Sequence, residues 1–401
     1  MSASATASLE LRRANNEALD ITPFVDTFVW TDSMLAGGFS WYLQFTAQAW
    51  REWDDLMLGR EKPVFQFRLR SEEDDGTQST EWRTAITDKS NAAFSQDTSM
   101  IGEIKGADRR LDMAQEHRTR KFLDVRASDV FARIASEHGL TPDIARTSEV
   151  SSWTQVRMDD WAFMREMARQ SSPESGRGDT YLWLEEDTLH YAFPTLSDLS
   201  DRSYDLSVVE SRVENYVGAY SGREADRFGA ATLIGVGFNF DTKKGIVFTM
   251  DPAAAASQPS LADRVPRRMG DGRRVFPVFE VDPKRVEEHV RARWGQLAPR
   301  YLSLRVNTRP DLTLRPNKII AMENNLGEDQ STPFLGRYAV LEVRHVLKKG
   351  SIETSLLGCR REAQEGDAQP TGASADQSGT RDGNQTAGIM PRTIVVAQEL
   401  G

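Results

Sequence analysis

The chain has 401 residues, 39% of them hydrophobic, so it is long enough for two or three domains with ordinary cores. Its net charge of −10 argues against sequence-independent binding to nucleic acid and against attachment to anionic membranes. A single cysteine excludes an internal disulfide and a cysteine-based metal site. Since the sequence also lacks an apolar run of membrane-spanning length and the apolar core of a signal peptide, we expect it to fold in a cytoplasm.

The N-terminal part of the chain changes its pattern near residue 21. Residues 1–20 are rich in alanine and serine and then charged, which predicts a flexible arm. From Phe24 onward, hydrophobic and polar residues alternate, most clearly over residues 39–47 and 65–69, and a period of two predicts half-buried strands. We therefore expect residues 21–120 to form a first antiparallel, β-barrel-like domain.

Residues 121–200 carry the most regular helical pattern in the sequence. Ser128 is a good N-cap for a first helix, and Gly139 follows the last turn of that helix. Asp159 or Asp160 can cap a second helix. A hairpin follows, with strands predicted at residues 181–185 and 189–193. These elements predict a small α+β domain of two helices and a hairpin.

Strand-like runs resume after residue 200 and predict a second β-barrel-like domain over residues 201–361. A low-complexity insertion at residues 252–274 interrupts this domain. We interpret the insertion as a solvated loop whose basic residues could contact the acidic face of a neighbouring subunit. These basic residues include Arg264, Arg267 and Arg268. Asp282 and Pro283 then open a further helix through Trp294.

The last part of the chain, residues 362–401, contains almost no apolar residues before position 389, which predicts a flexible tail. Ile394, Val395 and Val396 then restore β character. They form either a frayed end or a tethered strand that adds to another protein's sheet. The predicted fold class is therefore α+β and mostly β, with two barrel-like antiparallel β domains separated by a small helix–helix–hairpin domain.

Residue patterns that carry catalysis or bind a cofactor are missing from the sequence. The five histidines occur one per predicted element, without the paired spacing of a metal site. The nucleophile-elbow, zinc-protease and phosphate-loop motifs are absent as well. Gly235 and Gly237 lack the third glycine and the following helix of a dinucleotide site. We therefore predict no catalytic, cofactor-binding or metal-binding residues, and a protein that is not an enzyme.

The order of these segments resembles that of the baseplate hub proteins of contractile phage tails. That family includes the late control proteins of temperate phages, of which late control protein D is one, and the N-terminal part of type VI secretion spike proteins. The resemblance covers residues 24–361 and rests on segments 122–140 and 155–168, the hairpin that ends at residue 193, and segments 307–312, 315–317, 343–345 and 350–354. Two departures are Asn317, where the family has glycine, and the insertion at 252–274.

The resemblance implies a structural protein of which three copies form a ring. In that family each chain carries two similar barrel-like domains, so a homotrimer presents a pseudo-hexameric face to the sixfold tail tube and a threefold face to the trimeric central spike. The implied partners are therefore the chain itself, the tail tube protein, the spike protein, and baseplate wedge or other tail proteins. The implied location is the tail baseplate of a virion or of an equivalent injection particle, assembled in the bacterial cytoplasm.

Two other functions are compatible with the sequence. The chain could be a tail-associated component that hydrolyses cell wall, because hubs or their spikes sometimes carry hydrolases. It could also be a hexameric tail-tube protein or a receptor-binding β protein. Release of fragments from peptidoglycan would indicate the first alternative, and six copies per particle would indicate a tube protein.

Overall fold

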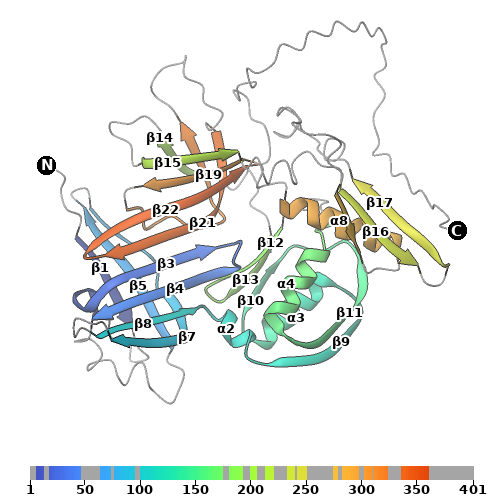
Figure 1. Ribbon diagram of the computed structural model, residues 1–401, viewed down its shortest axis with the longest axis horizontal. Coiled ribbons are helices and arrows are strands. Elements are labelled where there is room, and N and C mark those ends of the chain that lie inside the picture. The colour runs from blue at the N-terminus through green and yellow to red at the C-terminus, as the bar shows by residue number, and fades with distance from the viewer. Residues whose placement is uncertain are drawn as a thin grey trace, which may run out of the picture.

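The computed structural model describes residues 6–12, 18–46, 64–73, 76–94, 100–174, 180–192, 199–205, 213–220, 233–239, 242–250, 274–278, 282–297, 302–308, 310–323 and 336–360. Figure 1 shows a broad β region on one side of the molecule, and a helical module with a separate small sheet on the other. The chain is mostly β, which confirms the predicted fold class. Among the described residues, no helix is long and apolar enough to cross a membrane.

Within the described residues, fourteen strands from both ends of the chain form one sheet. They are β1 (Thr6–Arg12), β2 (Ala18–Asp20), β3 (Val25–Ser33), β4 (Gly38–Thr46), β5 (Val64–Glu73), β6 (Gly76–Ser79), β7 (Arg83–Phe94), β8 (Met100–Ala107), β14 (Leu199–Asp205), β15 (Val213–Tyr220), β19 (Leu302–Thr308), β20 (Ile319–Glu323), β21 (Gly336–Lys348) and β22 (Ser351–Arg360). The main path runs β15-β19-β22-β21-β3-β4-β8-β7-β5-β1-β2. Strand β6 pairs with β5, and β20 pairs with β14 and β21. A short 3₁₀ turn, η1 (Thr22–Phe24), precedes β3.

The first half of this sheet is strongly curled. Strands β3 and β5 are separated by β4, β8 and β7 along the path, so in a flat sheet they would lie roughly 19 Å apart. The ring centroids of Phe28 on β3 and Phe67 on β5 are nevertheless 5.2 Å apart. These rings pack with Trp30, Trp41 and Leu69 in one buried core. The sheet therefore curls so that its apolar face encloses this core, although the described pairings leave the path open at both ends.

The N-terminal segment corrects the sequence prediction. Residues 1–20 were expected to form a flexible arm, but β1 pairs with β5 in an antiparallel ladder that includes Leu9 opposite Leu69. Leu9 is fully buried, and Glu10 forms ion pairs with Arg68 and Arg70 on the neighbouring strand. The arm prediction failed because alanine and serine dominate the composition there and hide the short alternation of apolar and charged residues in β1.

The two β halves repeat the same arrangement of four strands. In the first half, the hairpin β3–β4 is followed along the sheet by β8 and then β7. In the second half, the hairpin β21–β22 is followed by β19 and then β15. Strands β3 and β21 pair antiparallel between the units. The outermost pair of each unit also contains a bulge, at Asp88 in β7 and at Glu214 in β15.

The helical module lies between the two halves in the sequence. It comprises α2 (Arg110–Met113), β9 (His117–Arg126), α3 (Ala127–Glu137), β10 (Thr141–Ile144), β11 (Val150–Asp159), α4 (Asp160–Gln170), β12 (Tyr181–Glu185) and β13 (Thr188–Ala192). Both predicted helices and the hairpin are present, but Ser128, predicted as the N-cap of α3, lies inside that helix, whose N-cap is Arg126 without a side-chain hydrogen bond. Asp159 caps α4 by accepting a hydrogen bond from the Ala162 N–H. The module contains two small sheets, β10-β13-β12 and β11-β9.

A third small sheet contains β16 (Leu233–Asn239), β17 (Lys244–Met250) and β18 (Arg274–Pro277). Helix α8 (Pro283–Leu297) packs against this third sheet.

Candidate interaction surfaces

The interface residues predicted from the sequence all lie outside the described residues. This applies to the basic cluster Arg264, Arg267 and Arg268 and to the C-terminal run Ile394, Val395 and Val396. Within the described part of the chain, no three His, Cys, Asp or Glu side chains gather closely enough to hold a metal ion. The described residues instead offer three internal junctions and one surface groove.

The first junction is a buried ion-pair cluster that joins the large sheet to the helical module. Arg83 on β7 lies 3.2 Å from Asp32 on β3, and it also lies 3.4 Å from Glu185 and 3.3 Å from Glu186, which belong to the hairpin β12–β13. Burial raises the pKa of Asp32, and the charge of Arg83 offsets part of that rise. One guanidinium therefore connects two strands and the hairpin, a role that spacing in the sequence does not reveal.

The second junction is the tight turn between β3 and β4. Arg110 on α2 donates to the carbonyl oxygens of Ala36 (2.6 Å) and Phe39 (2.5 Å), and it is held by Asp108 at 2.6 Å. The Gly37 carbonyl accepts a hydrogen bond of 2.9 Å from the Leu184 N–H on β12. A Cβ atom at Gly37 would lie only 2.4 Å from the Trp161 ring of α4. The turn thus requires glycine because the module packs directly on its backbone.

The third junction attaches α8 to the helical module. Glu288 accepts hydrogen bonds from the Ser172 N–H at 3.3 Å and from the Ser148 hydroxyl at 3.5 Å. Arg285 pairs with Glu288 at 3.2 Å, and its guanidinium lies 4.3 Å from the centroid of the Trp153 ring on β11. Burial raises the pKa of Glu288, against the opposing charge of Arg285. The helix therefore joins the third sheet to the module.

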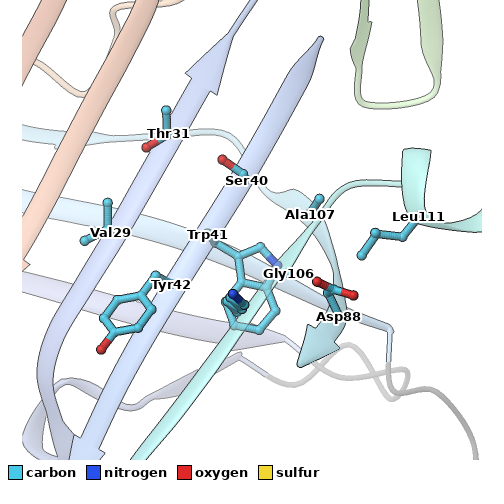
Figure 2. Close-up of a pocket in the computed structure, with 10 residues that line it drawn as sticks. Val29, Thr31, Ser40, Trp41, Tyr42, Asp88, Gly106, Ala107 and Leu111 are labelled. Carbon is cyan, nitrogen blue, oxygen red and sulfur yellow. The ribbon is translucent and has the colours of Figure 1, made fainter. Parts of the chain in front are cut away.

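The surface groove lies on the outer face of the first β half and has a volume of about 330 Å³. Figure 2 shows side chains of β3 and β4, among them Thr31 and Tyr42, on one side, with Asp88 of β7 and Leu111 of α2 on the other. Tyr42 donates a 2.9 Å hydrogen bond to Glu103, and burial together with this bond raises the pKa of Tyr42 to about 12.

The five histidines do not converge. His138 on the module contacts Asp160 at 2.9 Å, and His190 contacts Asp143 at 2.8 Å. His345 on β21 is completely buried and contacts the Thr354 hydroxyl at 2.9 Å. His289 lies on α8 and His117 at the start of β9. Each histidine therefore belongs to a separate local packing arrangement.

Comparison with protein families and with curated proteins gives no match: no family model and no curated sequence is similar to the chain. Solved structures do match over nearly its whole length. A tail protein from Neisseria meningitidis MC58 superposes with a TM-score of 0.58 at 12% identity, covering 91% of this chain and 98% of that one. The 43 kDa tail protein of prophage MuSo2 from Shewanella oneidensis gives 0.60 at 10% identity, covering 88% and 98%.

A third similar structure comes from a secretion system. A chain of the Francisella PdpA–VgrG complex superposes with a TM-score of 0.51 at 8% identity, covering 89% of this chain and 58% of that one. At these identities the similarity concerns the fold. It confirms, at that level, the resemblance to phage tail and secretion-spike proteins that the order of the segments predicts.

Proposed function

We propose that the chain is a structural baseplate hub of a contractile tail or a related injection device. Three copies form a ring in which six similar β units face the sixfold tail tube, while the threefold symmetry of the ring matches a trimeric spike. A closed interface requires matching symmetry on both sides, so a component between a sixfold and a threefold partner needs two similar units in each of three chains.

The repeated four-stranded arrangement is the observation that carries this proposal. In both units a hairpin is followed along the sheet by two further antiparallel strands. The order is β3-β4-β8-β7 in one unit and β21-β22-β19-β15 in the other. The two units meet at β3 and β21, so both belong to one continuous sheet of the same chain. A chain with two such units supplies the duplicated building block that a sixfold face in a trimer requires. The similarity to two tail proteins, each covered over 98% of its length, supports the same role.

The proposed partners are those of a hub. They are two further copies of the chain, the tail tube protein, the trimeric spike protein, and wedge or other tail proteins of the baseplate. We assign the insertion at 252–274 to contact with a neighbouring subunit, and residues 394–396 to contact with the spike or a neighbouring chain. The protein would be located in the tail baseplate after assembly in the bacterial cytoplasm, with no membrane anchor and no specific nucleic-acid binding.

The hub proposal assigns no chemical reaction to the chain. A cell-wall hydrolase would release soluble fragments from purified peptidoglycan, whereas a structural hub would leave the polymer intact. The assay should include a known lysozyme as positive control. Fragment release by the purified chain above that of a boiled sample would overturn this part of the proposal.

Mass measurement of the purified protein tests the ring directly. Light scattering coupled to gel filtration should give three times the mass of one chain, and electron microscopy of the same fraction should show a ring with six similar lobes. A particle of six chains would favour a tube protein. A chain that stays monomeric at high concentration and in the presence of the spike protein would contradict the hub.

A further inference from the structure

The helical module contains an internal duplication that the sequence conceals. Strand β9 and helix α3 occupy residues 117–137, and strand β11 and helix α4 occupy residues 150–170, which is 33 positions later throughout. The buried positions of the two helices match one for one: Ala127, Ser128, Val130, Phe131, Ile134 and Ala135 correspond to Asp160, Trp161, Phe163, Met164, Met167 and Ala168. Only Ala135 and Ala168 are identical between the copies.

The ladder between β9 and β11 has the same twofold symmetry. Lys121 pairs with Thr154, its own equivalent, and therefore marks the local axis. When each residue is replaced by its equivalent in the other copy, the pair Phe122–Trp153 becomes the pair Gln155–Arg120. The remaining pairs of the ladder are related in the same way. The two register shifts in this ladder are likewise related by the axis. The two-stranded ribbon is thus symmetric residue by residue.

In each copy, a residue with left-handed backbone angles lies at the bulge. Asp124 and Arg157 are equivalent, and both adopt left-handed backbone angles, with φ of 50° and 48°. The N–H of Asp124 donates to the Ser152 hydroxyl at 3.5 Å, and the N–H of Arg157 donates to the equivalent Thr119 hydroxyl at 3.2 Å. A left-handed conformation at a residue other than glycine is costly. It is kept in both copies.

In each copy, the residue before the left-handed position is apolar and lies on the outer face of the ribbon. Leu123 and Val156 immediately precede the left-handed residues, are equivalent under the 33-residue shift, and are each 58% exposed. Inward-facing neighbours such as Phe122 and Gln155 are buried. Two exposed aliphatic side chains at equivalent positions are not explained by the packing of the module, which uses the opposite face.

We propose that this outer face, formed by Leu123, Lys121 and Val156, is a docking surface for an extended segment of another tail protein. The segment carries a carboxylate between two apolar side chains, because the exposed Lys121 pairs with Thr154 on the axis between the two aliphatic residues. Each aliphatic residue lies two positions along its strand from the axis, in opposite directions. The separation is therefore roughly 13 Å along the ribbon.

This separation selects the geometry of the partner. Residues i and i+4 of a strand lie about 13 Å apart on one face, with residue i+2 between them. On a helix, residues i and i+8 lie roughly 12 Å apart but are rotated by about 80° around the helix axis, and the better aligned positions i+7 and i+11 lie roughly 10 Å and 16 Å away. The same face of a second copy is a poor partner, because face-to-face pairing would bring Lys121 against Lys121. This docking surface does not depend on the number of chains in the proposed ring.

A pair of synthetic hairpin peptides tests the proposal. One hairpin presents Val, Glu and Val at alternating positions on one face, and the other presents Val, Lys and Val. Fluorescence anisotropy against the full-length protein should show binding of the Glu hairpin about ten-fold tighter than binding of the Lys hairpin. In the Lys121→Glu variant this preference should reverse. A reversed preference would show that residue 121 contacts the central residue of the hairpin, because a general loss of structure would weaken the binding of both hairpins.

Two further variants define the apolar contacts. Leu123→Asp and Val156→Asp should each abolish hairpin binding while the circular dichroism spectrum stays unchanged, because both side chains are exposed. Leu19→Asp, which changes another exposed leucine on β2, is the matched control and should bind normally. The proposal is overturned if the Glu hairpin fails to bind at millimolar concentration, if both hairpins bind equally, or if the Leu123→Asp and Val156→Asp variants bind as well as the wild type.

Discussion

Arg83 on β7 and Asp32 on β3 form an ion pair across the curled first half of the sheet, and their side chains are only 2% and 7% exposed. The two strands are not neighbours, since β4 and β8 separate them on the main path. The pair therefore spans the curl on its inner side. It also orients Arg83 toward Glu185 and Glu186 of the helical module.

Removal of one partner of this pair should strongly destabilise the protein. Arg83→Met leaves the Asp32 carboxylate buried without its guanidinium, and losses of this kind cost about 3–5 kcal/mol in the free energy of unfolding. Urea unfolding at neutral pH measures the loss. Arg169→Met is the matched control: Arg169 forms an exposed pair with Glu166 within α4, and the expected loss is less than about 1 kcal/mol. Equal losses in the two variants would contradict a special role for the buried pair.

The glycine at the β3–β4 turn gives a second prediction. Gly37 and Gly350 both have positive φ, at 90° and 79°, so alanine is strained at either position. At Gly37 the added methyl group also meets Trp161, whereas at Gly350 nothing lies within 4 Å. Gly37→Ala should therefore lower the free energy of unfolding by about 1–3 kcal/mol more than Gly350→Ala does. If the two variants are equally stable, the module does not pack on the turn as described.

Stability should fall in mild acid because of a buried histidine. Burial and the nearby charge of Arg315 together lower the pKa of His345 to about 3, from an ordinary value of 6.5. The folded state therefore binds the proton less tightly than the unfolded state. The contribution of the neutral His345 to the free energy of unfolding is complete above pH 6.5. It is lost as the pH falls toward 3, by about 1.4 kcal/mol per pH unit.

The variant His345→Gln isolates this contribution. Urea unfolding between pH 6.5 and pH 4 should show a slope for the variant that is smaller by about one proton than that of the wild type. Part of the slope should remain, because burial also lowers the pKa of His289, to about 4. Parallel slopes for wild type and variant would show that His345 does not titrate with unfolding.

The sequence predicted the elements whose patterns are local. Alternation along β3 and β4, the cap at Asp159 and the glycine after α3 each depend on neighbouring residues, and the structure confirms them. The junctions could not be predicted in this way. Arg83 and Glu185 come from distant parts of the chain, and only the curl of the sheet and the docking of the hairpin bring them together.

The duplication of the helical module was hidden for a different reason. The two copies share burial pattern and backbone geometry but have almost no residue identity, so the aromatic Phe122 corresponds to the polar Gln155. A comparison of burial positions finds the repeat, whereas a comparison of residue types does not. The predicted interface residues, such as Arg264 and Ile394, lie outside the described residues and remain predictions.

The N-terminal strand offers the sharpest contrast between sequence and structure. A flexible arm would tolerate any substitution at Leu9, but in β1 this side chain is fully buried opposite Leu69. Leu9→Ala should therefore cost about 2–5 kcal/mol in the free energy of unfolding, the usual loss for a buried leucine. Leu19→Ala is the control, because Leu19 on β2 is 46% exposed, and it should change stability by less than about 0.5 kcal/mol.

Removal of the whole strand should have a second effect beyond lost stability. Deletion of residues 1–12 would uncover the edge of β5, whose backbone N–H and carbonyl groups pair with β1 over seven residue positions. An uncovered edge can pair with another chain, so the truncated protein should associate in a concentration-dependent way that the Leu9→Ala variant does not show. Light scattering over a dilution series measures this association. A truncated protein with the stability and mass of the wild type would restore the interpretation of residues 1–20 as a flexible arm.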